Sequence, residues 1–318
     1  MLRIHSQILK YRIVSQSLRL VATLLPCNPV TLQLCNSINS MNSTTLLKDE
    51  LILEPGQGIK HYWRDLWSYR ELFFFLAWRD VAVRYKQTAI GLAWAIIRPV
   101  LVMIIFTVIF GGLAQMPSDG VPYPILVYSA LLPWQLFANA LAESSNSLIS
   151  NAGMISKVYF PRLAIPFSSV VVSFVDFAIA FAILVVLMVW YQYPPGWPVV
   201  LLPFFILLAC AAAMGAGLWM ASLNVKYRDF RYIVPFIVQF GLYVSPVGFS
   251  SSVVPEQWRL LYSLNPMVGV IDGFRWAILG NTTIYWPGFI LSVGLVLGLL
   301  ISGLWYFRQT ERTFADVI

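Results

Sequence analysis

Residues 163–190 read LAIPFSSVVVSFVDFAIAFAILVVLMVW and contain a single charged side chain, Asp176. A helix needs about 20 apolar residues to cross a bilayer, so this stretch is predicted to be a transmembrane helix. Asp176 lies about thirteen residues inside it, close to the midplane, where an unpaired carboxylate is costly. It is expected to be protonated, paired or exposed to water. A structural hydrogen bond is the favoured interpretation, because no acidic or histidine partner for a proton relay lies at similar depth.

Five other stretches have the same apolar character. They are 92–114, 121–142, 197–223, 232–249 and 285–307. Over the whole chain of 318 residues, 59% are hydrophobic and 11% are charged, whereas about a quarter are charged in an ordinary soluble domain. The sequence therefore predicts an all-α, polytopic membrane protein with six transmembrane helices, of which the fifth is the shortest.

The segment between the fifth and sixth spans, Ser250–Thr283, is too polar for lipid and too apolar for a free loop. Irregular backbone is tolerated at membrane depth where it packs on protein. We therefore expect short re-entrant helices there.

The basic residues indicate the orientation of the chain. Of 21 Lys and Arg residues, eighteen fall on one side of the predicted spans, eleven of them before the first span. Cytoplasmic segments carry such an excess, so both termini are predicted to be cytoplasmic. The net charge of +7 is thereby explained by topology, and no nucleic-acid partner is expected.

The first forty residues do not resemble the rest of the chain and are interpreted as an extension. Met41 follows them and opens a polar leader, 41–59, so translation is expected to start at Met41. Residues 60–318 are predicted to form a single membrane domain, since no linker divides them.

Residues 60–86 are predicted to form an amphipathic helix in the cytoplasmic headgroup layer. Six aromatic or apolar side chains fall within about 60° of one another on a helical projection. These are Trp63, Trp67, Phe74, Trp78, Val81 and Tyr85. The helix is either a membrane anchor or an element that passes motion to the first span, and the missing linker favours the second. Arg98 lies about six residues inside that span, where its guanidinium can reach the interface, and Pro99 predicts a bent entry.

The loop 143–166 reads ESSNSLISNAGMISKVYFPRLAIP. Its second half carries an apolar cluster between two basic residues. The cluster is Ile155, Val158, Tyr159 and Phe160, flanked by Lys157 and Arg162. An exposed cluster of this kind is typical of a docking surface for a soluble partner, and packing against the bilayer is the alternative.

Motifs for catalysis and nucleotide binding are missing from the sequence. It contains no G-x-x-x-x-G-K-[ST] phosphate loop, no G-x-S-x-G and no H-E-x-x-H, which are motifs for phosphate binding, nucleophilic catalysis and zinc. Its three cysteines, Cys27, Cys35 and Cys210, show no metal-ligand spacing. The chain is therefore expected to be no enzyme and to hold no cofactor or metal of its own.

Seven motifs follow one another between Tyr62 and Ile318. They are W-S-Y-R-E-L at 67–72, R-D-V-A-V-R-Y-K-Q-T-A-I-G-x-x-W at 79–94, K-V-Y-F-P-R at 157–162, Y-R-D-F-R-Y-I-V-P at 227–235, S-P-V at 245–247, L-N-P-M at 264–267 and E-R-T-F-A-D-V-I at 311–318. In order and spacing they resemble the transmembrane subunit of bacterial polysaccharide ABC exporters. That family exports lipopolysaccharide O-antigen, capsular polysaccharide or teichoic acid.

The resemblance implies two copies of this chain in the inner membrane, bound to two copies of a separate ATPase that binds ATP and magnesium and drives a lipid-linked polysaccharide outward. It implies that residues 250–283 form an outer gate. It also implies an ATPase-coupling segment with Asn151, Ile155, Lys157, Val158, Tyr159, Phe160, Pro161 and Arg162. A cytoplasmic gate would include Trp67, Arg70, Glu71, Arg79, Asp80, Arg84, Tyr85, Lys86 and Arg98.

A sliding glycan can bind through its C–H faces to aromatic rings. Candidate rings are Trp94, Tyr128, Trp134, Phe137, Phe236, Phe240 and Tyr243, and each could instead belong to the membrane core or belt. Two other functions remain open: export of a small drug or lipid, and a membrane-embedded glycan polymerase or ligase. For the latter, the outer loops offer only Asp119, Glu256, Arg259, Asp272 and Arg275.

Overall fold

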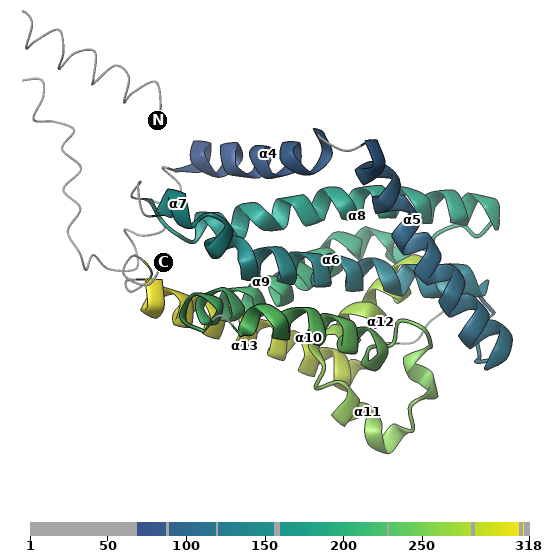
Figure 1. Cartoon of the computed structure of the whole chain (residues 1–318). Coiled ribbons are helices and arrows are strands. Elements are labelled where there is room, and N and C mark those ends of the chain that lie inside the picture. Colours follow the sequence, from purple (N-terminus) through teal and green to yellow (C-terminus); the bar gives the residue numbers. More distant parts are fainter. Residues whose placement is uncertain are drawn as a thin grey trace, which may run out of the picture. The chain divides into compact units, whose positions relative to one another are not determined.

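The structure is a computed structural model that describes residues 69–86, 89–118, 120–155, 160–227, 229–280, 284–311 and 314. All of these residues belong to one compact unit, Ile59–Ile318, and every regular element among them is a helix (Figure 1). The elements are α4 (Arg70–Lys86), α5 (Ala89–Phe106), η1 (Thr107–Leu113), α6 (Tyr123–Ser150), α7 (Ala152–Ile155), α8 (Ala164–Trp190), η2 (Trp197–Leu201), α9 (Leu202–Lys226), α10 (Phe230–Val244), η3 (Ser251–Val253), α11 (Glu256–Tyr262), α12 (Pro266–Leu279) and α13 (Trp286–Thr310). The expected extension 1–40 and the start at Met41 lie outside the described residues.

Helix α6 forms the centre of the packing. It contacts α8 and α9 along most of its length, and α9 in turn packs on α13. In the most apolar part of α6, 83% of the residues are buried, against 17% in the span formed by α5 and η1. The first span therefore lies at the periphery of the chain, with most of its apolar side chains exposed.

In the part of the chain that the structure describes, five helices are long and apolar enough to cross a membrane, counting α5 with η1 and η2 with α9 as single spans. The sixth apolar helix, α10, has 15 residues. At 1.5 Å per residue it is about 22 Å long, which is shorter than the roughly 30 Å hydrocarbon core. The polytopic all-α fold is confirmed, with five long apolar helices and one shorter apolar helix at the position of the fifth predicted span, which was expected to be the shortest.

The second span is longer than expected. The sequence placed a loop from residue 143, whereas α6 continues to Ser150. The hydroxyls of Ser144, Ser145 and Ser147 donate to carbonyls three residues earlier, so these polar side chains are satisfied inside the helix. Packing against α9 then compensates for their modest helix propensity.

The segment between α10 and α13 contains η3, α11 and α12 (Figure 1). Helix α12 begins at a cap, because the Asn265 side chain accepts a hydrogen bond from the Met267 amide and Pro266 occupies the first turn. It ends at Gly280, whose φ of 71° favours glycine. Most of α12 is buried against α6, α9 and α13, so the expected short helices packed on protein are present.

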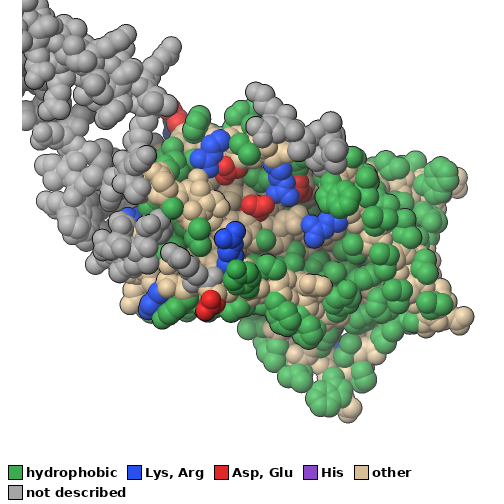
Figure 2. Space-filling model, viewed as in Figure 1, with side chains coloured by type: hydrophobic (Ala, Val, Ile, Leu, Met, Phe, Trp, Pro, Cys, Tyr) green, Lys and Arg blue, Asp and Glu red, His purple; other side chains and the backbone are tan. Residues whose placement is uncertain are grey.

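The charged side chains gather at one end of the bundle. Figure 2 shows them over the end where α7 and the last turns of α13 lie, while hydrophobic side chains cover most of the remaining visible face. We call this region the charged end and define it by Arg79, Asp80, Arg84, Glu143, Arg162 and Glu311. Helices α11 and α12 lie toward the opposite end (Figure 1).

Candidate coupling site

Helix α4 packs along α8 and presents two different faces (Figure 1). Leu76 and Ala77 are buried, while Phe74 and Trp78 are exposed. Tyr85 was expected on the same face as Phe74 and Trp78, but its hydroxyl contacts α8. The helix therefore has an exposed aromatic side and a polar side that is held by the rest of the protein.

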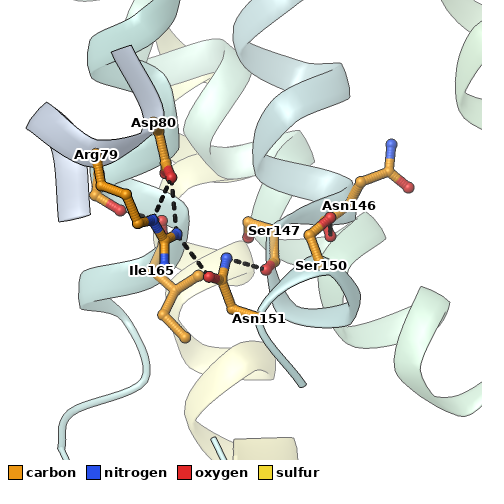
Figure 3. A network of polar contacts seen from close by, with 8 residues as sticks. Arg79, Asp80, Asn146, Ser147, Ser150, Asn151 and Ile165 are labelled. Atoms are coloured by element: carbon orange, nitrogen blue, oxygen red, sulfur yellow. Dashed lines mark hydrogen bonds and ion pairs between the residues drawn. The ribbon is translucent and has the colours of Figure 1, made fainter. Parts of the chain in front are cut away.

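One polar network joins α4 to the end of α6 (Figure 3). Arg79 forms an ion pair with Asp80 at 2.7 Å, and the same nitrogen, Nη2, donates to Oδ1 of Asn151 at 2.7 Å. The Asn151 amide nitrogen donates to the carbonyl of Ser147 at 2.9 Å, inside the last turn of α6. Asn151 therefore links α4 to the end of α6, immediately before the first residue of α7.

A second network lies at the C-terminal end of α4. Arg84 forms ion pairs with Glu143 on α6 at 2.9 Å and with Asp176 on α8 at 2.8 Å, and the Tyr85 hydroxyl donates to Asp176 as well. Burial, followed by the hydrogen bond to Asp176, raises the pKa of Tyr85 above its ordinary value, so the hydroxyl remains a donor. The carboxylate of Asp176 is thus paired, which is one of the three states that the sequence analysis expects for it.

The expected docking residues are not all exposed. Ile155 and Phe160 are buried in the chain's own apolar core, so neither offers its side chain to a partner. Pro161 is buried beside them. Lys157, Val158 and Tyr159 lie outside the described residues, as do Trp67 and the side chain of Lys86.

The C-terminal end of this segment is held by residues that follow α13. Glu311 accepts a hydrogen bond from the Arg162 amide at 3.0 Å, and its carbonyl accepts one from the Arg162 guanidinium. That guanidinium also lies 5.9 Å from the centre of the Phe314 ring, which packs against Phe307. The segment 151–162 is therefore fixed at its start by α4 and at its end by the residues after α13.

The remaining gate candidates are exposed. Arg70 and Glu71 lie in the first turn of α4, and Arg98 lies on the exposed side of α5. Pro99 is buried and α5 continues through it. The structure thus brings Arg79, Arg84 and Tyr85 into contacts with other helices and leaves these three at the surface.

The candidate path aromatics separate into two groups. Tyr128, Trp134 and Phe137 on α6 are buried, and the Tyr128 hydroxyl donates to the Ala180 carbonyl. Their burial removes them from the surface that this chain offers to a passing polymer. Exposed aromatic rings remain on α5 and α10, namely Trp94, Phe236, Phe240 and Tyr243.

Sequence reasoning missed three residues of this region: Glu143, Glu311 and Phe314. Each contacts a residue that lies 59 or more positions away, which no local pattern reveals. The sequence did contain one electrostatic signal for these contacts. Asp176 lies within a predicted span and therefore needs a cationic partner, and Arg84, next to Tyr85 in the sequence, is a candidate for it. The arrangement can transmit displacement between the segment 151–162 and α4. Among the described residues it includes no group of three metal-ligating side chains.

Comparison with known proteins identifies relatives over this same region. The family model described as "ABC-2 type transporter" matches residues 71–279. The O-antigen export system permease protein RfbA of Myxococcus xanthus is 26% identical, over 67% of this chain and 82% of its own length. RfbA of Klebsiella pneumoniae is 27% identical over 78% and 95% of the two chains. The polysialic acid transport protein KpsM of Escherichia coli is 23% identical over 70% and 83%.

Proposed function

Since this chain belongs to the ABC-2 type transporter family, we propose that it is the membrane subunit of an ATP-driven exporter that moves lipid-linked polysaccharide of the O-antigen class outward across the bacterial inner membrane. The names of the O-antigen and polysialic acid relatives support this substrate class. The chain lacks a phosphate loop, so ATP and magnesium are assigned to a separate ATPase chain. Because that ATPase uses cytoplasmic ATP, the charged end is assigned to the cytoplasmic side.

The membrane arrangement follows from that assignment. The five long helices span the bilayer and α10 is the sixth, shorter span, which places both termini in the cytoplasm. The first turns of α4 lie toward the cytoplasmic interface, where the exposed Phe74, Phe75 and Trp78 are suited to the headgroup layer, and its C-terminal end reaches along α8 to Asp176. Helices α11 and α12 are the re-entrant helices on the outer side.

The observation that carries the mechanism is the hydrogen bond from Arg79 to Asn151. Asn151 opens the segment expected to dock on the ATPase, while Arg79 belongs to the proposed gate helix α4. Movement of the docked segment therefore reaches α4 through a direct contact. Val158 and Tyr159, with Lys157, remain the proposed docking side chains, whereas Ile155, Phe160 and Pro161 serve as the buried base of the segment.

The proposed polymer path lies between two copies of this chain. Phe236 and Phe240 are stacked at 5.9 Å with an interplanar angle of 9°, and they continue along α10 toward Tyr243. Rings in such a row offer repeated, equivalent contacts to the C–H faces of sugars. The largely exposed α5 and α10 together provide the surface that a second copy would face.

The test is transport in proteoliposomes that contain this chain and its partner ATPase. ATP should drive lipid-linked O-antigen into the lumen of vesicles whose charged end faces outward, and transport should stop without ATP. In the Arg79→Gln variant, ATP hydrolysis should continue while the glycan transported per ATP falls severalfold. The control is Arg231→Gln, which changes an exposed arginine on α10 that belongs to neither the proposed gate nor the docking segment. Absence of ATP-dependent transport in the unmodified complex would refute the proposed function.

A further inference from the structure

A cavity of about 340 Å³ lies between η3, α11, α12 and the start of α13, toward the end of the bundle opposite the charged end (Figure 1). Its volume is near the lower limit of roughly 300 Å³ for small-molecule sites. One wall is polar and includes Ser251, Ser252, Arg259, Asp272 and Arg275. Of the five charged residues that the sequence offers on the outer side, three belong to this wall: Arg259, Asp272 and Arg275. The fold therefore brings together charges that are separated in the sequence.

The polar wall is held in place by hydrogen bonds. Arg259 donates to the carbonyls of Val254 and Ser252, both at 3.0 Å. Arg275 donates to the carbonyls of Val247 at 2.9 Å and Phe249 at 2.7 Å. Both guanidinium groups therefore have fixed positions, and the backbone around η3 is tied to α11 and α12.

Asp272 is the acceptor of the cavity wall. Its carboxyl group accepts a hydrogen bond from Ser251 and lies near the guanidinium groups of Arg275 and Arg259. A carboxylate accepts several hydrogen bonds, and adjacent ligand hydroxyls can supply them. Tyr262 also lines the cavity, and its buried hydroxyl has no hydrogen-bond partner in the part of the chain that the structure describes.

The apolar part of the lining is aromatic and aliphatic. It includes Tyr285, Phe289 and Val268, and Phe289 is braced edge-on by Trp286 at 6.1 Å. The polar groups of the lining favour a polar ligand over a purely apolar one. Both guanidinium groups disfavour a cation and already donate to backbone carbonyls, and the carboxyl group of Asp272 disfavours an anion. The lining therefore selects an uncharged molecule with hydroxyl groups on its edges and a C–H face.

We propose that this cavity binds a single six-membered sugar ring on the outer side of the protein. The ring hydroxyls bond to Asp272, the serines and Arg259, while the C–H face lies on the aromatic wall. The further statement that this sugar is a unit of the exported polymer rests on the proposed function. A unit held here would oppose return of the polymer while the cytoplasmic end resets.

The experiment is saturation-transfer NMR on the full chain with its ATPase in nanodiscs, without ATP. The probes are the methyl glycosides of glucose, galactose, mannose and rhamnose at millimolar concentration. At least one should show transfer, and Asp272→Asn should weaken its binding about two- to tenfold, as expected for loss of one hydrogen bond to the carboxyl group. Ser252→Trp introduces a bulky side chain at an exposed position of the lining and should abolish transfer. Glu256→Gln changes an exposed acid on α11 outside the cavity and should change nothing.

Transfer to none of the four glycosides, or transfer that is unchanged in either cavity variant, would overturn the inference. Thermal unfolding of each variant shows whether it is folded. ATP-driven transport in proteoliposomes separates the two claims. Export by a complex that binds no glycoside overturns this inference and leaves the proposed function standing, whereas binding without export does the reverse.

Discussion

Arg84 connects α4 to two other helices through one guanidinium. Its partner Asp176 keeps only 13% of its side chain exposed, while Glu143 keeps 46%. The two ion pairs therefore differ in their contribution to stability. An exposed pair contributes little, whereas an enclosed carboxylate that loses its partner destabilises the folded protein. The contact with Asp176 is the one that should matter for stability.

Replacing Arg84 with Met removes the charge and keeps most of the side-chain length. We expect loss of about 1.5–3 kcal/mol of stability, the range for hydrogen bonds to charged groups, because Tyr85 would be the one partner left to Asp176 among the described residues. Thermal unfolding in detergent measures the change. Arg70→Met, on the exposed first turn of the same helix, should have little effect.

The double variant Arg84→Met/Asp176→Asn tests the cause. It removes both charges, so it should be more stable than Arg84→Met alone. If the double variant loses the sum of the two single effects, the ion pair is not what holds α4 on α8.

At the scale of elements, α9 and α13 cross at unusually close range. A Cβ atom added at Gly303 would lie 2.4 Å from the carbonyl oxygen of Gly215, and one added at Gly215 would lie 2.6 Å from the backbone at Leu299 and Leu300. Backbone atoms of a packed helix cannot move aside cheaply. These two glycines therefore set the distance between the helices.

Gly303→Ala should separate the two helices and destabilise the protein by about 1–3 kcal/mol, the usual cost of overpacking. Gly298→Ala, on the same helix, is the matched control, because a Cβ atom there meets nothing within 4 Å among the described residues. It should be neutral or stabilising by up to about 1 kcal/mol through helix propensity. The unfolding midpoints of the two variants measure the difference. Equal midpoints would contradict the inference that Gly303 is needed for the close approach of α9 and α13.

Helix positions were largely predictable from the sequence, because membrane spans depend on apolar length alone. The third span was expected at 163–190 and α8 occupies Ala164–Trp190. The end of α6 was missed, since serines and asparagines indicate a loop unless their side chains bond back to the helix. The contacts of α4 were also missed, because the same amphipathic pattern suits an isolated surface helix and a helix packed on its neighbours.

At the scale of the whole molecule, the exposed aromatic row on α10 depends on burial that sequence cannot reveal. Helix α6 is apolar on most sides, so its sequence gives little periodic signal for the face that packs inward. Tyr128 and Phe240 were therefore equally good candidates, although the first is fully buried and the second is 60% exposed. Only the packing of α6 at the centre separates them.

Phe240→Ser should slow polysaccharide export about two- to tenfold, as loss of one aromatic contact of 0.5–1.5 kcal/mol implies. Stability should change little because the ring is exposed. The control is Trp305→Ser on α13, which removes a ring of 63% exposure away from α5 and α10. Initial export rates at matched ATPase activity give the comparison; an equal loss in both variants would argue against a path along α10.

The hydrogen bonds between Arg162 and Glu311 have a consequence for synthesis of the protein. The two residues are separated by 149 positions, so the ribosome makes the segment 151–162 long before it makes Glu311. During that interval the segment has its anchor at Asn151 but lacks the one at Arg162. An ATPase that recognises the segment only when both ends are fixed would therefore ignore nascent chains and assemble only with chains whose last span has already been inserted.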